Sequence, residues 1–79
     1  MMEARVKVLY FGQAREITGI NSEEFTAGDT SSLRIRILDK YPRIGTLPFL
    51  LALNCRVIKE ESLLKDNDTV AILPPFEGG

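Results

Sequence analysis

Strand-like segments stand near both ends of this chain, and each is apolar on both of its faces. Residues 5–11 and residues 69–73 follow the two-residue period of an extended strand. One face holds Val6, Val8 and Tyr10 in the first segment and Val70 and Ile72 in the second, and the opposite faces hold Leu9, Phe11, Ala71 and Leu73. A strand that is apolar on both faces is typically covered on both sides. We therefore expect the two segments to lie side by side, in parallel, at the centre of one sheet.

The residues between these segments predict one main helix and three further strands. The predicted order is a short helix over 13–18, a strand over 21–27, a helix over 31–41, a loop over 43–48, and two strands over 49–53 and 56–59 joined by a turn at Asn54-Cys55. A chain of 79 residues forms one domain. We predict an α+β fold in which a mixed sheet of about five strands packs on one main helix. Residues 1–75 form this domain, and residues 76–79 form a flexible tail.

The segment over residues 31–41 fits two secondary structures. Residues 33–37 alternate as a strand does, whereas Leu33 and Ile37 have helical spacing. The segment is long and ends at Pro42, and a proline disfavours helical geometry in the residue before it. We predict a helix, with Ile35 at the edge of its buried stripe.

Composition argues against several classes of function. The chain has 10 Lys and Arg against 11 Asp and Glu, without a basic block, so nucleic acid is not the expected partner. No apolar run is long enough to span a membrane. A single cysteine and the lack of a secretory segment predict a cytoplasmic protein. Cys55 is either a sulfur relay or an incidental turn residue.

The chain contains no histidine, which is the commonest metal ligand and the usual general base near neutral pH. We expect chemistry to occur at the end of the chain, with the catalytic groups supplied by a partner. The sequence ends Pro74-Pro75-Phe76-Glu77-Gly78-Gly79. Glycine has no Cβ and passes through narrow channels, and a proline pair keeps its segment extended. This ending predicts a thin arm whose carboxylate is the reactive group, and the alternative is a frayed terminus.

Two blocks of sequence resemble the small subunit of molybdopterin synthase, a ubiquitin-like β-grasp family. The first block runs from Lys7 to Glu16 and contains Ala14-Arg15-Glu16, and the second contains Leu53-Asn54, Leu64-Lys65-Asp66-Asn67-Asp68-Thr69-Val70 and the Pro-Pro-x-x-Gly-Gly ending. Asn67 departs from the glycine of the family pattern. Asparagine is unusually tolerant of positive φ, so we expect a small loss of stability and no change of fold.

The resemblance implies a sulfur carrier. Gly79, preceded by Gly78, would be adenylated and converted to a thiocarboxylate that gives sulfur to the pterin precursor of the molybdenum or tungsten cofactor. The implied partners are a ubiquitin-activating-type adenylating enzyme, which uses ATP, and the large subunit of molybdopterin synthase in a heterotetramer. The chain would bind no permanent cofactor and no metal, and the catalytic residues would belong to the large subunit.

The resemblance also implies a partner interface. Its expected residues are Phe11, Arg15, Val57, Leu73, Pro74, Pro75, Phe76 and Glu77. The apolar members could equally be ordinary sheet residues, and Arg15 a solvated charge or a helix cap. Three other functions stay open: a carrier for thiamine, cysteine or tRNA thiolation, a protein modifier that forms isopeptide bonds, and a plain binding module with an incidental tail.

Overall fold

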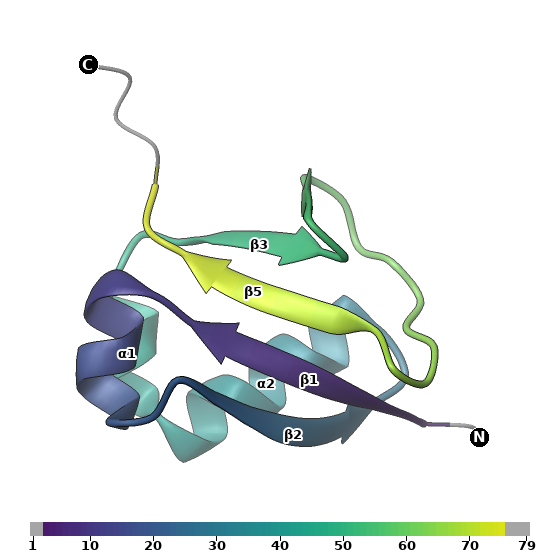
Figure 1. Ribbon diagram of the computed structural model, residues 1–79, viewed down its shortest axis with the longest axis horizontal. Coiled ribbons are helices and arrows are strands. Elements are labelled where there is room, and N and C mark those ends of the chain that lie inside the picture. Colours follow the sequence, from purple (N-terminus) through teal and green to yellow (C-terminus); the bar gives the residue numbers. More distant parts are fainter. Residues whose placement is uncertain (1–2, 76–79) are drawn as a thin grey trace.

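The computed structural model describes residues 3–75 and contains a five-stranded mixed sheet with helices against one face (Figure 1). The elements are β1 (Ala4–Tyr10), α1 (Gly12–Thr18), β2 (Ser22–Ala27), α2 (Thr30–Lys40), a 3-10 helix (Pro42–Thr46), β3 (Leu50–Leu53), β4 (Arg56–Ile58) and β5 (Thr69–Leu73). This arrangement confirms the predicted α+β fold. The 3-10 helix corrects the predicted loop over 43–48: its Ile44 is buried, so the segment closes the core after α2.

The two terminal strands occupy the middle of the sheet. The strand order is β2-β1-β5-β3-β4, and β1 and β5 are parallel, with Lys7 opposite Thr69 and Tyr10 opposite Ile72. The other neighbouring strands are antiparallel. The prediction that the chain's ends pair in parallel at the centre of the sheet is therefore confirmed.

The inner face of the sheet forms the core with α2. Val8 and Val70 are 0% exposed, and they belong to one apolar cluster with Leu33 and Ile37 of the helix. Figure 1 shows α2 passing behind the central strands. In the described residues, no helix lies over the outer face of the same strands (Figure 1).

The segment over residues 31–41, whose sequence fits both a strand and a helix, forms helix α2. Asp29 caps its first turn by accepting a hydrogen bond from the Ser32 backbone N–H at 2.8 Å, which lowers the pKa of the Asp29 carboxyl. The expected position of Ile35 was wrong, because this side chain is 65% exposed. At about 100° per residue, Ile35 points nearly opposite to Leu33.

Two segments that resemble the family pattern, Leu53-Asn54 and residues 64–70, connect the β3–β4 hairpin to β5. Asn54 and Cys55 turn the chain with φ of 51° and 74°. The Asn54 side chain accepts a hydrogen bond from the Thr69 N–H and donates one to Asp68 Oδ1, both at 2.9 Å. Asp68 Oδ2 accepts from the Lys65 N–H at 2.8 Å, and the bonds from Asn54 and Lys65 lower the pKa of Asp68. These contacts fasten the hairpin to the beginning of β5.

Asn67 adopts the left-handed conformation that its motif requires, with φ of 73°, while its N–H donates to the Arg5 carbonyl at 2.9 Å. We predict that Asn67→Ala lowers the free energy of unfolding by about 1 kcal/mol, because the left-handed conformation costs alanine roughly 1–2 kcal/mol, whereas the short polar side chain of asparagine tolerates it better. Asn67→Gly should match or exceed the original stability. Urea denaturation of the three chains measures both effects. Equal stability of the alanine and glycine variants would show that positive φ at residue 67 costs alanine nothing, which would contradict this prediction.

Candidate functional site

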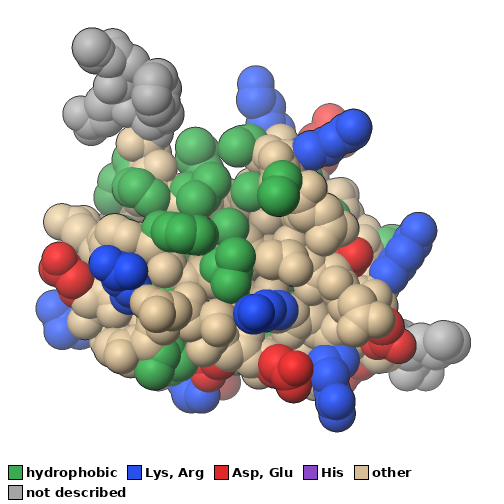
Figure 2. All heavy atoms as spheres, viewed as in Figure 1, with side chains coloured by type: hydrophobic (Ala, Val, Ile, Leu, Met, Phe, Trp, Pro, Cys, Tyr) green, Lys and Arg blue, Asp and Glu red, His purple; other side chains and the backbone are tan. Residues whose placement is uncertain are grey.

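An apolar surface lies on the outer side of the sheet, facing away from α2. Its members share one face by strand register, and we call them the open face: Leu9, Leu50, Ala52, Val57, Ala71 and Leu73. The register places Leu9, Ala71, Ala52 and Val57 in one row across four strands. Figure 2 shows apolar side chains gathered over β5 and β3 on this side.

Exposure on this surface is greatest at its β4 edge and near the end of β1. Val57 is 51% exposed and Phe11 is 42% exposed. Leu73 is half-buried. Grouped apolar exposure of this kind marks a surface that another molecule covers.

The base of the tail lies against the corner between β1 and α1. Gly12 has φ of 57°, and a Cβ built there would lie 3.5 Å from Pro74 Cγ. A hollow of about 260 Å³ opens beside this contact, and we call it the tail groove. Its lining residues are Phe11, Gln13, Ala14, Leu47, Pro48, Phe49, Ile72, Leu73, Pro74 and Pro75. The structure thus brings four of the expected interface residues into one apolar region.

Two further expected residues, Val57 and Arg15, do not line the tail groove. Val57 is joined to the region only through the open face. Arg15 is exposed on α1, and its guanidinium Nη1 lies 3.4 Å from Asn21 Oδ1. Phe76, Glu77, Gly78 and Gly79 lie outside the described residues, so their expected roles stay predictions.

Sequence reasoning missed part of this site. Leu9 and Ala71 could have been found, because strand alternation already placed them opposite the core. Leu47 and Phe49 carried no such signal, since they reach the tail groove through a loop between the 3-10 helix and β3. Their place there depends on the packing of α1 against the 3-10 helix.

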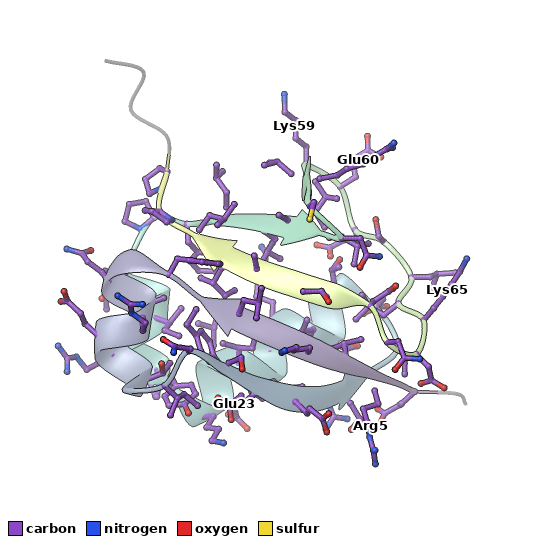
Figure 3. The ribbon with its side chains drawn as sticks, viewed as in Figure 1. Arg5, Glu23, Lys59, Glu60 and Lys65 are labelled. Atoms are coloured by element: carbon purple, nitrogen blue, oxygen red, sulfur yellow. The ribbon has the colours of Figure 1, made fainter. Side chains whose placement is uncertain are left out.

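A polar cluster ties β1, β2 and α2 together at the other side of the sheet, where Figure 3 labels Glu23. Glu23 accepts a hydrogen bond from the Tyr10 hydroxyl at 2.7 Å and pairs with Lys40 Nζ at 2.6 Å. Burial by itself would raise the pKa of Glu23, but the hydrogen bonds from Lys40 and Tyr10 outweigh it and lower that pKa. Burial and the same carboxylate raise the pKa of Tyr10, and the bond to Glu23 raises that of Lys40.

We predict that Glu23→Gln lowers the free energy of unfolding by about 1–2 kcal/mol at pH 7, because hydrogen bonds to a charged group are lost. A carboxyl whose pKa is lowered by folding stabilises the protein above its unfolded pKa and loses this effect as pH falls through its folded pKa. The difference from the wild type should therefore shrink below about pH 4. Urea denaturation across this pH range measures it.

Glu24→Gln is the matched control, because its side chain is 67% exposed and 3.9 Å from Arg5. Its stability should differ from the wild type by less than about 0.5 kcal/mol. A loss of unfolding free energy in Glu23→Gln that stays constant with pH would contradict the stabilising role of the charged Glu23 carboxylate.

In residues 3–75 no three His, Cys, Asp or Glu side chains are grouped to hold a metal ion. No helix within this part of the chain has the length and apolar character needed to cross a membrane.

Comparison with known proteins identifies the family. A sequence model of the ThiS family matches residues 8–79. The chain belongs to the ThiS family. It is 37% identical over 82 residues to the molybdopterin synthase sulfur carrier subunit of Chlamydomonas reinhardtii, covering 95% of this chain and 99% of that protein. The resemblance to the small subunit of molybdopterin synthase is thereby confirmed.

Solved structures of similar proteins confirm the ubiquitin-like β-grasp fold of this ThiS-family chain. The small archaeal modifier protein 1 of Methanosarcina acetivorans superposes with a TM-score of 0.87 at 27% identity, covering 100% of both chains. A second structure is the complex of subunits 1 and 2 of the molybdopterin-converting factor from Helicobacter pylori. It matches with a TM-score of 0.73 at 31% identity, covering 95% of this chain and 99% of that one.

Proposed function

We propose that this chain is the sulfur carrier subunit of a molybdopterin synthase and that the carboxylate of Gly79 carries the sulfur. The observation that supports this most is the 37% identity to a molybdopterin synthase sulfur carrier subunit over nearly the full length of both proteins. The family match also runs through residue 79 and so includes the Gly-Gly ending. The open face and the tail groove adjoin the point where this ending leaves the sheet.

The proposed chemistry needs an adenylating enzyme, a sulfur donor and the large subunit. A terminal carboxyl has a pKa of about 3.3–3.7, so it is ionised and unreactive toward nucleophiles at pH 7. An adenylating enzyme would join a Gly79 oxygen to the α-phosphorus of ATP and release pyrophosphate. A sulfur donor would then displace AMP and leave a thiocarboxylate, whose sulfur is a strong nucleophile. The large subunit would supply the catalytic residues for transfer to the pterin precursor.

This chain's own residues hold and deliver the reactive end. Pro74 and Pro75 limit the directions in which the arm leaves β5, which lowers the entropy lost when a partner captures it. A fully extended chain of four residues spans at most about 13 Å at roughly 3.3 Å each, which is the reach available to residues 76–79 for delivering Gly79 to a recessed site of the partner. Gly78 and Gly79 present no side chain to a narrow channel.

The open face is the proposed docking surface for the large subunit. Its apolar side chains gain free energy when they leave water, and aromatic residues and arginine are enriched at interfaces. Leu73 of the open face is therefore a proposed contact, together with two residues outside that face, Phe11 in the lining of the tail groove and Arg15 on α1. The Helicobacter pylori structure supports this partner class, because it is a complex of the two subunits. The proposed assembly is a heterotetramer with two copies of this chain.

Reconstitution with defined acceptors tests the proposal. The chain would be loaded with sulfur and mixed with the large subunit and pterin precursor, and in parallel with thiamine, cysteine and tRNA thiolation systems. We expect sulfur in the pterin product only when the large subunit is present. Sulfur transfer to one of the other acceptors but never to the pterin would assign the chain to another pathway.

A second candidate function is protein modification. It is favoured by the match over both full chains to a protein described as a small archaeal modifier. The adenylated Gly79 would then form an isopeptide bond with a lysine amine and release AMP. Lysine conjugates that survive reductant in cell extracts would support this function, and their absence under conditions where sulfur is loaded would exclude it.

A further inference from the structure

Positive charge lies beside the open face on the outer side of the sheet. The outward positions of β1, β5, β3 and β4 hold two charged residues, Arg5 and Lys7, and both are cationic. Lys7 stands two residues before Leu9, which begins the apolar row of the open face. Two residues of a strand rise about 6.8 Å, so the Lys7 Cα lies about 7 Å from this row. Figure 2 shows Lys and Arg side chains bordering the apolar gathering.

The two cations differ in their partners within the chain. Arg5 Nε lies 3.9 Å from Glu24 Oε1. Glu24 also stands opposite Lys7 across the β1–β2 pair, yet within residues 3–75 Lys7 forms no salt bridge. Lys7 is exposed, and an ammonium group is strongly hydrated in water. In the free chain, water therefore solvates this charge.

A partner that covers the open face also covers Lys7. A standard interface buries about 800 Å² on each partner, which corresponds to a round patch with a radius of roughly 16 Å. Neighbouring strands lie about 4.8 Å apart, so the apolar row across four strands spans about 14 Å and Lys7 falls within such a patch. Its ammonium then loses water, and this loss costs free energy unless an anionic group replaces the water.

We propose that the large subunit presents a carboxylate to Lys7, an inference that rests on the proposed function. Charge complementarity selects this occupant of the open face over a second copy of the chain, which would bring the same two cations to the contact. A charge pair at the margin of an interface acts mainly on the association rate and on the choice of partner. Lys7 is therefore a specificity-determining residue, and the apolar row supplies the area that is buried.

Stopped-flow binding of the unmodified full chain to the large subunit tests this pairing. At about 10 mM ionic strength, where the Debye length is about 30 Å, Lys7→Glu should lower the association rate constant by at least about 10-fold. The loss should shrink to less than about threefold at 1 M, where the Debye length is about 3 Å. Lys7→Arg keeps the charge and should associate at close to the wild-type rate.

Lys65→Glu is the matched control, because it makes the same change of charge on the loop before β5, away from the open face (Figure 3). Its association rate should fall by less than about threefold. Lys7→Gln guards against a loss of folding, since Lys7→Glu places like charges opposite each other at Glu24. Lys7→Gln should lower the low-salt rate by about threefold or more, with unchanged thermal unfolding.

The partner side of the pair is tested by charge reversal. Replacing the matching carboxylate of the large subunit by lysine should restore fast association with Lys7→Glu. Wild-type rates for both Lys7→Gln and Lys7→Glu, or an equal loss in Lys65→Glu, would overturn the inference. Tight binding by all of these chains would leave the proposed function intact, whereas a wild-type chain that never binds the large subunit would refute both.

Discussion

Removal of Gly79 is expected to lower the rate of thiocarboxylate formation by at least about 10²-fold, because a misplacement of 1 Å at a reacting atom already costs that much. Deleting one residue withdraws the terminal carbon by roughly 3.3–3.8 Å. It also leaves the carboxylate of Gly78 short of the adenylating site. Incubation with the adenylating enzyme, ATP and a sulfur source, followed by intact-mass spectrometry, measures the effect.

The deletion should leave the folded body intact, because β5 ends at Leu73 and the core lies within residues 4–72. Thermal unfolding of the shortened chain is therefore expected to match the wild type. Glu77→Gln is the matched control, since it alters the arm without changing its length, and it should be loaded at close to the wild-type rate. Loading of the shortened chain at the wild-type rate would show that the position of the last carboxylate is unimportant.

Val57→Asp is expected to weaken binding of the large subunit by roughly 30-fold or more, which corresponds to about 2 kcal/mol. Val57 is 51% exposed and lies at the end of the row that crosses the open face. In the proposed complex its side chain is covered, and a carboxylate there would lose hydration without gaining a partner. Titration of the large subunit by calorimetry, with unmodified chain as the reference, measures the change.

Ile35→Asp is the control for this substitution. Ile35 is also a large exposed apolar residue, 65% accessible, but it lies on α2 behind the sheet. Both variants should fold, because neither side chain belongs to the core. Equal weakening by the two variants, or none by Val57→Asp, would move the interface away from the open face.

The fold was predictable because its main signals are local. The alternation in β1 and β5 and the spacing of Leu33 and Ile37 show which side of each element is buried, and one small sheet has few ways to satisfy these patterns. Positive φ at Asn67 was expected from the family resemblance, because the family pattern has glycine at this position. Ile35 was expected at the edge of the buried stripe, but at about 100° per residue its angle around α2 turns it away from Leu33, and its side chain is 65% exposed.

The site was predictable only in part. Phe11, Leu73 and Val57 followed from the family resemblance, while Leu47 and Phe49 reach the tail groove through tertiary packing that no local pattern records. The contacts of Glu23 with Tyr10 and Lys40 were missed for the same reason, since they join three elements distant in sequence. Residues 76–79, which carry the proposed chemistry, lie outside the described part of the chain.

The mass of the intact chain after reaction with a cognate adenylating enzyme, ATP and a sulfur source tests the central claim most directly. The account predicts a gain equal to the exchange of one oxygen for one sulfur, dependent on ATP and located at Gly79 by fragmentation. A persulfide on Cys55 would instead add a whole sulfur atom. A chain whose mass never changes with several cognate enzymes, or whose sulfur is found only on Cys55, would contradict the proposal that Gly79 is the sulfur-carrying group.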